Sequence, residues 1–191
     1  MNRELTINVL LANSKRATPF LIIFTIAILN ILSCGGAGKK TVDSSQTYPR
    51  VDYNWYLSTL EEKTVPFSEF KDKVVFLHIW ASWCPPCLKE IPGIQQLYNT
   101  LNKGEVVFVI ASSENKDKIQ QFLITNQIHL PVYMIHGPLP QQFRNEYIPR
   151  TYIVDRFGKI VYHKIGQADW NTKEIKEFLH FLSNVRVTDQ P

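Results

Sequence analysis

The chain has 191 residues, of which 45% are hydrophobic and 12% aromatic, and it carries a formal net charge of +4. This length and composition can bury the core of one globular domain, which excludes a disordered protein. Without the basic N-terminal segment described next, the remainder carries about +2. A charge this weak and dispersed gives no reason to expect a nucleic-acid partner.

The first 33 residues have the pattern of an export signal. Lys15 and Arg16 precede the uncharged stretch PFLIIFTIAILNILS, which is shorter than the roughly 20 residues of a membrane-spanning helix. The sequence ILSC at 31–34 resembles the lipobox of bacterial lipoproteins. We therefore predict a lipoprotein-type signal peptide over 1–33, cleaved before a lipidated Cys34. The alternative is an uncleaved signal anchor in which Cys34 is incidental, and both place the folded part outside the cytoplasm at a membrane.

The rest of the chain divides into a tether and one domain. Residues 34–50 are rich in Gly, Ser, Thr and charged residues and have no apolar period, which predicts a flexible tether. A single domain is expected over 51–191. It opens with the aromatic and β-branched runs VDYNWYL and TVPFSEF on either side of EEK at 61–63, which predict an N-terminal β-hairpin.

The next elements alternate between strand and helix patterns. Short, nearly uninterrupted apolar runs predict buried strands over 73–80, 105–112 and 130–135. Apolar residues at helical spacing predict helices over 84–102 and 115–127. A central sheet built by these elements is expected to contain parallel strands, because each pair of strands is separated by a helix.

The C-terminal third predicts a hairpin between two helices. A short helix is expected over 138–147, and the runs TYIVD and IVYHKIG within 151–166 flank the turn RFGK. Gly158 can take the positive φ that such a turn uses. A last helix is predicted over 171–184, with Asn171 as its N-cap. The fold class is therefore α/β, with a central mixed sheet flanked by helices.

The sequence WCPPC at 83–87 could bind a metal, form an inert disulfide or exchange electrons. A zinc site is disfavoured because there is no second cysteine pair and the five histidines are scattered, so no metal is expected. A structural disulfide is the stronger alternative in an exported protein, although a two-residue loop removes little entropy from the unfolded chain. Electron exchange fits best if a helix begins near Cys84, because its first turn favours a thiolate there.

The chain resembles the exported TlpA/ResA/DsbE-like thiol-disulfide oxidoreductases of the thioredoxin fold. The resemblance covers about 51–185 and rests on WCPPC, on LKEIP at 88–92, on the Ile148-Pro149 step before TYIVD, and on the turn DRFGK. It implies a thioredoxin-like fold with the β-hairpin as an N-terminal extension. It also implies that the redox-active Cys84–Cys87 pair works without another cofactor.

The resemblance implies a role for several residues. Cys84 would be the nucleophile, Cys87 the resolving thiol, and Pro149 the cis-proline beside them, an isomer that an X-Pro bond can adopt at low cost. Glu90 matches an acidic residue that assists proton transfer near the thiols. The implied substrate-docking surface comprises Trp83, Pro85, Pro86, Ile148 and Pro149.

Three positions leave alternatives open. His78 stands where relatives carry Asp or Asn, and it is either a satisfied core residue or a proton relay to Cys87. Glu90 is either catalytic or a first-turn acid favoured by the helix dipole. Arg150 follows the proline, where a Thr is usual, and brings a charge near the docking surface.

The resulting functional prediction is a membrane-tethered thiol-disulfide oxidoreductase, most simply one that reduces exported proteins and serves cytochrome c maturation. A membrane electron donor of the DsbD/CcdA type would re-reduce it. The alternatives are an oxidase or isomerase of exported proteins, and a non-catalytic lipoprotein of the same fold that binds a partner or copper. The protein would face the periplasm or the outer side of the cytoplasmic membrane.

Overall fold

The computed structural model describes residues 49–101, 104 and 106–185. The predicted signal peptide, Cys34 and the tether up to residue 48 lie outside these residues. Within them, the helices are all too short or too polar to cross a membrane.

The described residues form a mixed β-sheet with helices packed on it. The strands lie in the order β2-β1-β5-β4-β3-β6-β7. Their bounds are β1 Tyr56–Thr59, β2 Thr64–Pro66, β3 Val74–Ile79, β4 Val106–Ser112, β5 Val132–Ile135, β6 Arg150–Val154 and β7 Ile160–Ile165. The helices are α2 Pro85–Leu101, α3 Lys116–Thr125 and α4 Lys173–Asn184, with 3-10 turns η1 Phe67–Phe70 and η2 Gln141–Phe143.

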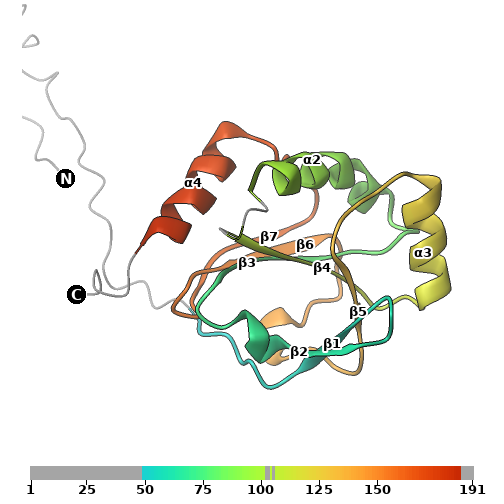
Figure 1. Ribbon diagram of the computed structural model, residues 1–191, viewed down its shortest axis with the longest axis horizontal. Coiled ribbons are helices and arrows are strands. Elements are labelled where there is room, and N and C mark those ends of the chain that lie inside the picture. Colours follow the sequence, from blue (N-terminus) through green and yellow to red (C-terminus); the bar gives the residue numbers. More distant parts are fainter. Residues whose placement is uncertain (1–48, 102–103, 105, 186–191) are drawn as a thin grey trace, which may run out of the picture. The chain divides into compact units, whose positions relative to one another are not determined.

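Parallel pairing is confined to the middle of the sheet. Strands β3, β4 and β5 are parallel neighbours, joined through α2 and α3. Both connections step in the same direction across the sheet, so right-handed crossovers place both helices on one face. In Figure 1, α2 and α4 lie together over that face. The start of α2 therefore lies at the C-terminal ends of β3 and β4.

Antiparallel hairpins complete both edges, as the sequence predicts. The β1–β2 hairpin pairs with β5, and its turn contains Glu62 with a φ of 65°. The β6–β7 hairpin pairs with β3, and Gly158 in its turn has a φ of 75°. The mixed α/β sheet and the N-terminal hairpin are thus confirmed.

Two hydrophobic clusters sandwich the sheet. One lies under the helices and joins Phe76 and Phe108 of the sheet to Ile94 of α2 and Leu179 of α4. The other covers the opposite face with aromatic rings from the loops, where Trp55 stacks on Phe67 at 4.4 Å and Phe143 approaches the same ring. Because β3 is buried on both faces, its continuous apolar run is explained.

Two local predictions were wrong. The segment predicted as a short helix over 138–147 forms only the turn η2, preceded by Pro140. Each proline disfavours the helical conformation of the residue before it, so a helix cannot begin ahead of Pro140. The N-cap of α4 is Thr172 rather than Asn171, and the Thr172 hydroxyl accepts from the Ile175 N–H at 3.3 Å.

Candidate active site

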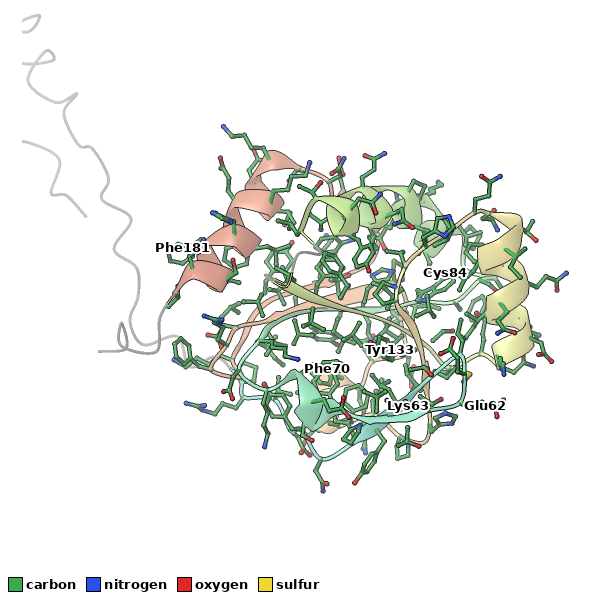
Figure 2. The ribbon with its side chains drawn as sticks, in the orientation of Figure 1. Glu62, Lys63, Phe70, Cys84, Tyr133 and Phe181 are labelled. Atoms are coloured by element: carbon green, nitrogen blue, oxygen red, sulfur yellow. A yellow bond between two sulfur atoms is a disulfide. The ribbon has the colours of Figure 1, made fainter. Side chains whose placement is uncertain are left out.

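Cys84 and Cys87 are joined by a disulfide at the N-terminal end of α2. Cys84 follows the loop that leaves β3 and directly precedes Pro85, the first residue of the helix. Figure 2 labels Cys84 at the end of α2 that lies toward α3. The fold thus holds both sulfur atoms at the edge where the parallel strands end, the usual location of sites in open α/β sheets.

The first turn of α2 directs a free backbone N–H group toward the sulfur of Cys84. The backbone N–H of Cys87 donates to Cys84 Sγ at 3.3 Å, the bond that an N-cap oxygen would otherwise accept. Pro85 and Pro86 carry no N–H, so Cys87 supplies the first donor of the helix. A thiolate at Cys84 would gain this hydrogen bond and the positive end of the helix dipole, and both favour the thiolate over the thiol.

Both cysteines are buried, but they differ slightly in exposure. The exposed fraction of Cys84 is 3% and that of Cys87 is 0%, so Cys84 is the outer residue and Cys87 lies beneath it. Trp83, by contrast, is 69% exposed, and Pro85 and Pro86 are also exposed beside it. A partner protein can therefore contact these three residues, and of the two cysteines beneath them only Cys84 retains any exposure.

The peptide bond between Ile148 and Pro149 is cis, as the resemblance implies. This bond lies against the disulfide, with the Ile148 carbonyl oxygen 3.9 Å from Cys84 Sγ. Ile148 is half-buried and Pro149 is buried. Within the described part of the chain, the backbone of Ile148 makes no backbone hydrogen bond, which leaves its N–H and C=O for an extended partner segment.

Glu90 is buried one helical turn beyond Cys87. Its Oε1 accepts from the Ala168 N–H at 2.6 Å and from the indole N–H of Trp170 at 2.8 Å. Burial raises the pKa of Glu90 above its ordinary value, while these two hydrogen bonds and Lys164 act to lower it. The alternative of a first-turn acid is wrong, because Glu90 is the sixth residue of α2 and its side chain faces the interior.

His78 lies on β3 beneath α2 and is completely buried. Its Nδ1 is 2.8 Å from the hydroxyl oxygen of Thr151 on the neighbouring strand, and its Nε2 is 3.8 Å from Oε2 of Glu90. Burial lowers the pKa of His78 to about 3, so the imidazole is neutral at physiological pH. His78 is therefore only partly satisfied as a core residue, and the structure brings it next to Glu90.

Two supports of the site were not predicted from the sequence. The first is the pair Trp170 and Ala168, which donate to Glu90. The second is Glu114, which holds the loop before the cysteines because its carboxylate accepts from Ser82 N–H at 2.6 Å and from Ser82 Oγ at 2.7 Å. Ser82 follows β3 and Glu114 follows β4. Because β3 and β4 are parallel neighbours, the residues that follow them meet at the same ends of the strands. The order of the predicted strands could therefore have identified the contact between Ser82 and Glu114.

No metal site accompanies the cysteines in residues 49–101, 104 and 106–185. No group of three or more His, Cys, Asp or Glu side chains there could hold an ion. The ionisable and redox-active groups gathered at this site are the Cys84–Cys87 pair, the buried Glu90 carboxyl group and the neutral His78 imidazole.

Comparison with known proteins places this geometry in a family. Residues 38–179 match the family model described as Redoxin. The chain is 28% identical over 167 residues to thiol-disulfide oxidoreductase ResA of Bacillus thuringiensis subsp. konkukian (strain 97-27), covering 83% of this chain and 94% of the relative. It is 25% identical over 166 residues to sporulation thiol-disulfide oxidoreductase A of Bacillus subtilis (strain 168), covering 84% and 97%.

Solved structures agree with this placement. StoA from Bacillus subtilis is 27% identical and superposes with a TM-score of 0.56, covering 68% of this chain and 98% of that chain. A putative thiol:disulfide interchange protein DsbE from Chlorobium tepidum, 21% identical, has the same fold with a TM-score of 0.60 over 72% of this chain and 100% of that one. The chain belongs to the Redoxin family, within which it is a thioredoxin-like thiol-disulfide oxidoreductase.

Proposed function

We propose that this protein is a membrane-tethered reductant of disulfides in exported, cysteine-containing proteins. The observation that carries the proposal is the arrangement of Cys84 and Cys87. Cys84 Sγ accepts the first free N–H of α2 and Cys84 is the outer residue of the pair, whereas Cys87 has no exposure. Such an arrangement favours attack by one cysteine and release by the other.

The reaction begins from the dithiol form. The Cys84 thiolate attacks one sulfur of a substrate disulfide, that S–S bond breaks, and one substrate thiolate leaves while a mixed disulfide forms at Cys84. Cys87, as a thiolate, then attacks Cys84 Sγ and displaces the second substrate thiolate. Two electrons pass to the substrate, whose two thiolates take up protons, and the protein is left with the Cys84–Cys87 disulfide.

Glu90 is proposed to accept the proton that Cys87 loses before its attack. Cys87 and Glu90 are three residues apart on the buried face of α2, so their side chains are neighbours. A carboxyl group with a raised pKa is better matched to a thiol than an ordinary exposed one. The neutral imidazole of His78, 3.8 Å from Glu90 Oε2, would help to position the carboxyl group.

The docking surface is proposed to bind an extended partner segment. Exposed Trp83, Pro85 and Pro86 lie on one side of Cys84, and the cis Ile148–Pro149 step lies on the other. The unpaired backbone groups of Ile148 can form hydrogen bonds to a segment in strand conformation. Such binding would bring the partner disulfide to Cys84.

The proposal extends to the location and the electron supply. The basic-then-apolar pattern up to ILSC at 31–34 supports export and a lipid on Cys34. A donor of the DsbD/CcdA type would return electrons to the Cys84–Cys87 disulfide, and apocytochrome c with its haem-attachment cysteines is the proposed substrate class. The mass of the mature N-terminus tests the anchor, because a lipid-modified Cys34 would support it and an intact Met1 would contradict it.

Trapping tests the proposed reaction. In cells that express the full chain with Cys87→Ala, attack at Cys84 can still occur but release cannot, so partner proteins should accumulate in mixed disulfides. Acid quenching, thiol blocking and mass spectrometry would identify exported proteins joined to Cys84. The matched control is Cys84→Ala, which keeps one cysteine of the pair but lacks the accessible one. Recovery of no partners, or of the same partners from both variants, would overturn the mechanism.

A further inference from the structure

Arg150 is a buried cation immediately after the cis-proline. Its exposed fraction is only 7%, and its Nη1 donates to the carbonyl oxygen of Tyr147 at 3.0 Å. Its Nε is buried and has no hydrogen-bond partner among the described residues. One hydrogen bond therefore accounts for only one of the five N–H donors of this guanidinium group.

The charge of Arg150 lacks a counter-ion in the described part of the chain. No carboxylate oxygen there lies within 4.0 Å of its guanidinium nitrogens. Burial lowers the pKa of Arg150 from its ordinary value, but an arginine side chain stays protonated in proteins. A buried donor without a hydrogen-bond partner is costly, so the unpaired Nε of Arg150 calls for a functional explanation.

Arg150 also lines a cavity. The cavity has a volume of about 490 Å³ and lies between the loop after β5 and the start of β6. Arg144 lines it as well, with its Nε donating to the Leu139 carbonyl oxygen at 2.7 Å, and Glu146 is the acidic residue of its lining. Two guanidinium groups and one carboxylate leave the cavity with a net positive charge, which favours an anion.

We propose that this cavity binds the carboxylate of an Asp or Glu side chain from the partner protein, with Arg150 as the residue that recognises it. The inference rests on the proposed function, because the partner segment is the one that docks beside Pro149. A guanidinium group binds a carboxylate through paired, charge-assisted hydrogen bonds, and Arg150 Nε is free to form one of them.

The position of Arg150 sets where the acid must lie. The Ile148 carbonyl oxygen contacts Cys84 Sγ, and Arg150 lies two residues further along the chain. In an extended partner segment, an acid two residues from the attacked cysteine lies about 7 Å from it along the chain, and this is the spacing that the experiment tests. The protein would thus select disulfides with acidic neighbours.

The experiment compares three symmetric peptide disulfides. Each disulfide joins two copies of a short peptide that contains one cysteine. The residues two positions before and two positions after that cysteine are both Glu in the first peptide, both Gln in the second and both Lys in the third. Pre-reduced full-length protein is mixed with each disulfide, and the second-order rate constant is read from the thiol released after acid quenching. We expect the Glu peptide to react about tenfold faster than the Gln peptide, and the Lys peptide to be slowest.

Variants separate recognition by Arg150 from general attraction of an acidic peptide. Arg150→Met should react equally fast with the Glu and Gln peptides. Arg150→Lys should keep part of the preference. The matched control is Arg156→Met, which removes the same charge from a site outside this cavity, where Arg156 Nη1 approaches the Val185 carbonyl oxygen at 3.5 Å. It should keep the full preference.

Each outcome decides one question. If the unmodified protein reduces the Glu and Gln peptides at rates within twofold, the carboxylate site is overturned and the proposed reductase stands. If it reduces no peptide, the proposed function itself fails. If thermal unfolding shows that Arg150→Met does not fold, the carboxylate site is still tested by the ratio of the Glu-peptide rate to the Gln-peptide rate, measured for the unmodified protein and for Arg150→Lys. Loss of the preference in Arg156→Met would also contradict a specific site.

Discussion

Nε2 of His78 and Oε2 of Glu90 lie 3.8 Å apart, and neither atom has a hydrogen-bond partner within the described residues. Each side chain is fixed at its other polar atom, His78 by Thr151 and Glu90 by Trp170 and Ala168. If the Thr151 hydroxyl donates to Nδ1, the imidazole proton is on Nε2 and faces the Glu90 carboxyl group. In that tautomer the imidazole N–H and the carboxyl group would face each other beneath the cysteines.

Replacement of Glu90 by Gln should slow the release step. The side chain keeps its size and can still accept from Trp170, but it can no longer take a proton from Cys87. Loss of such a proton acceptor costs roughly a hundredfold in rate. The decay of a mixed disulfide formed at Cys84, followed by acid quenching, measures this step directly. Glu177→Gln is the control, because Glu177 is exposed on α4, and equal rates for both variants would remove Glu90 from the mechanism.

The titrations of His78 and Glu90 should change the free energy of unfolding with pH in opposite directions. The folded protein holds the pKa of His78 at about 3, whereas an unfolded chain protonates it near 6.5. Below pH 6.5 the unfolded state therefore binds more protons than the folded state. The free energy of unfolding should fall by roughly 3 kcal/mol as the pH is lowered from 6.5 to 4. His78→Asn should remove this loss in urea unfolding.

Glu90 acts in the other direction. Its pKa is raised by burial, so above pH 4.5 the folded state binds more protons than the unfolded state. Stability should therefore fall as the pH rises from 4.5 through the folded pKa, and Glu90→Gln should remove that fall. The same urea series measures both effects. A stability profile that neither variant changes would show that the two groups titrate normally.

Trp170→Phe tests how Glu90 is held. The substitution keeps an aromatic ring against Phe76 but removes the N–H that donates to Glu90. Because this hydrogen bond lowers the pKa of Glu90, its loss should raise that pKa and move the pH profile of mixed-disulfide release upward. The free energy of unfolding should fall by about 1–3 kcal/mol.

The matched control for Trp170 is Trp55→Phe. Trp55 is also buried, but its indole N–H has no hydrogen-bond partner among the described residues. Its replacement should lower stability through packing alone and leave the pH profile of the release step in place. A similar shift in both variants would mean that the Trp170 hydrogen bond does not set the pKa of Glu90.

Local patterns predicted most of the fold and the central part of the site. The apolar run of β3, the helix that starts at the cysteines and the hairpin around Gly158 are all visible in neighbouring residues. The partners of the buried polar groups are not. His78 and Thr151 are 73 positions apart, and Glu90 and Trp170 are 80 apart. Such contacts depend on the register of β3 against β6 and on the loop before α4, which periodicity does not encode.

The reduction potential of the Cys84–Cys87 pair tests the central claim most directly. The full-length protein in detergent would be equilibrated with defined ratios of reduced and oxidised dithiothreitol, and its free thiols counted after alkylation. A dedicated reductant should have a potential below about −200 mV, in the range of thioredoxin. A value near −120 mV, typical of a strong disulfide-forming oxidant, would contradict the proposed direction of electron flow.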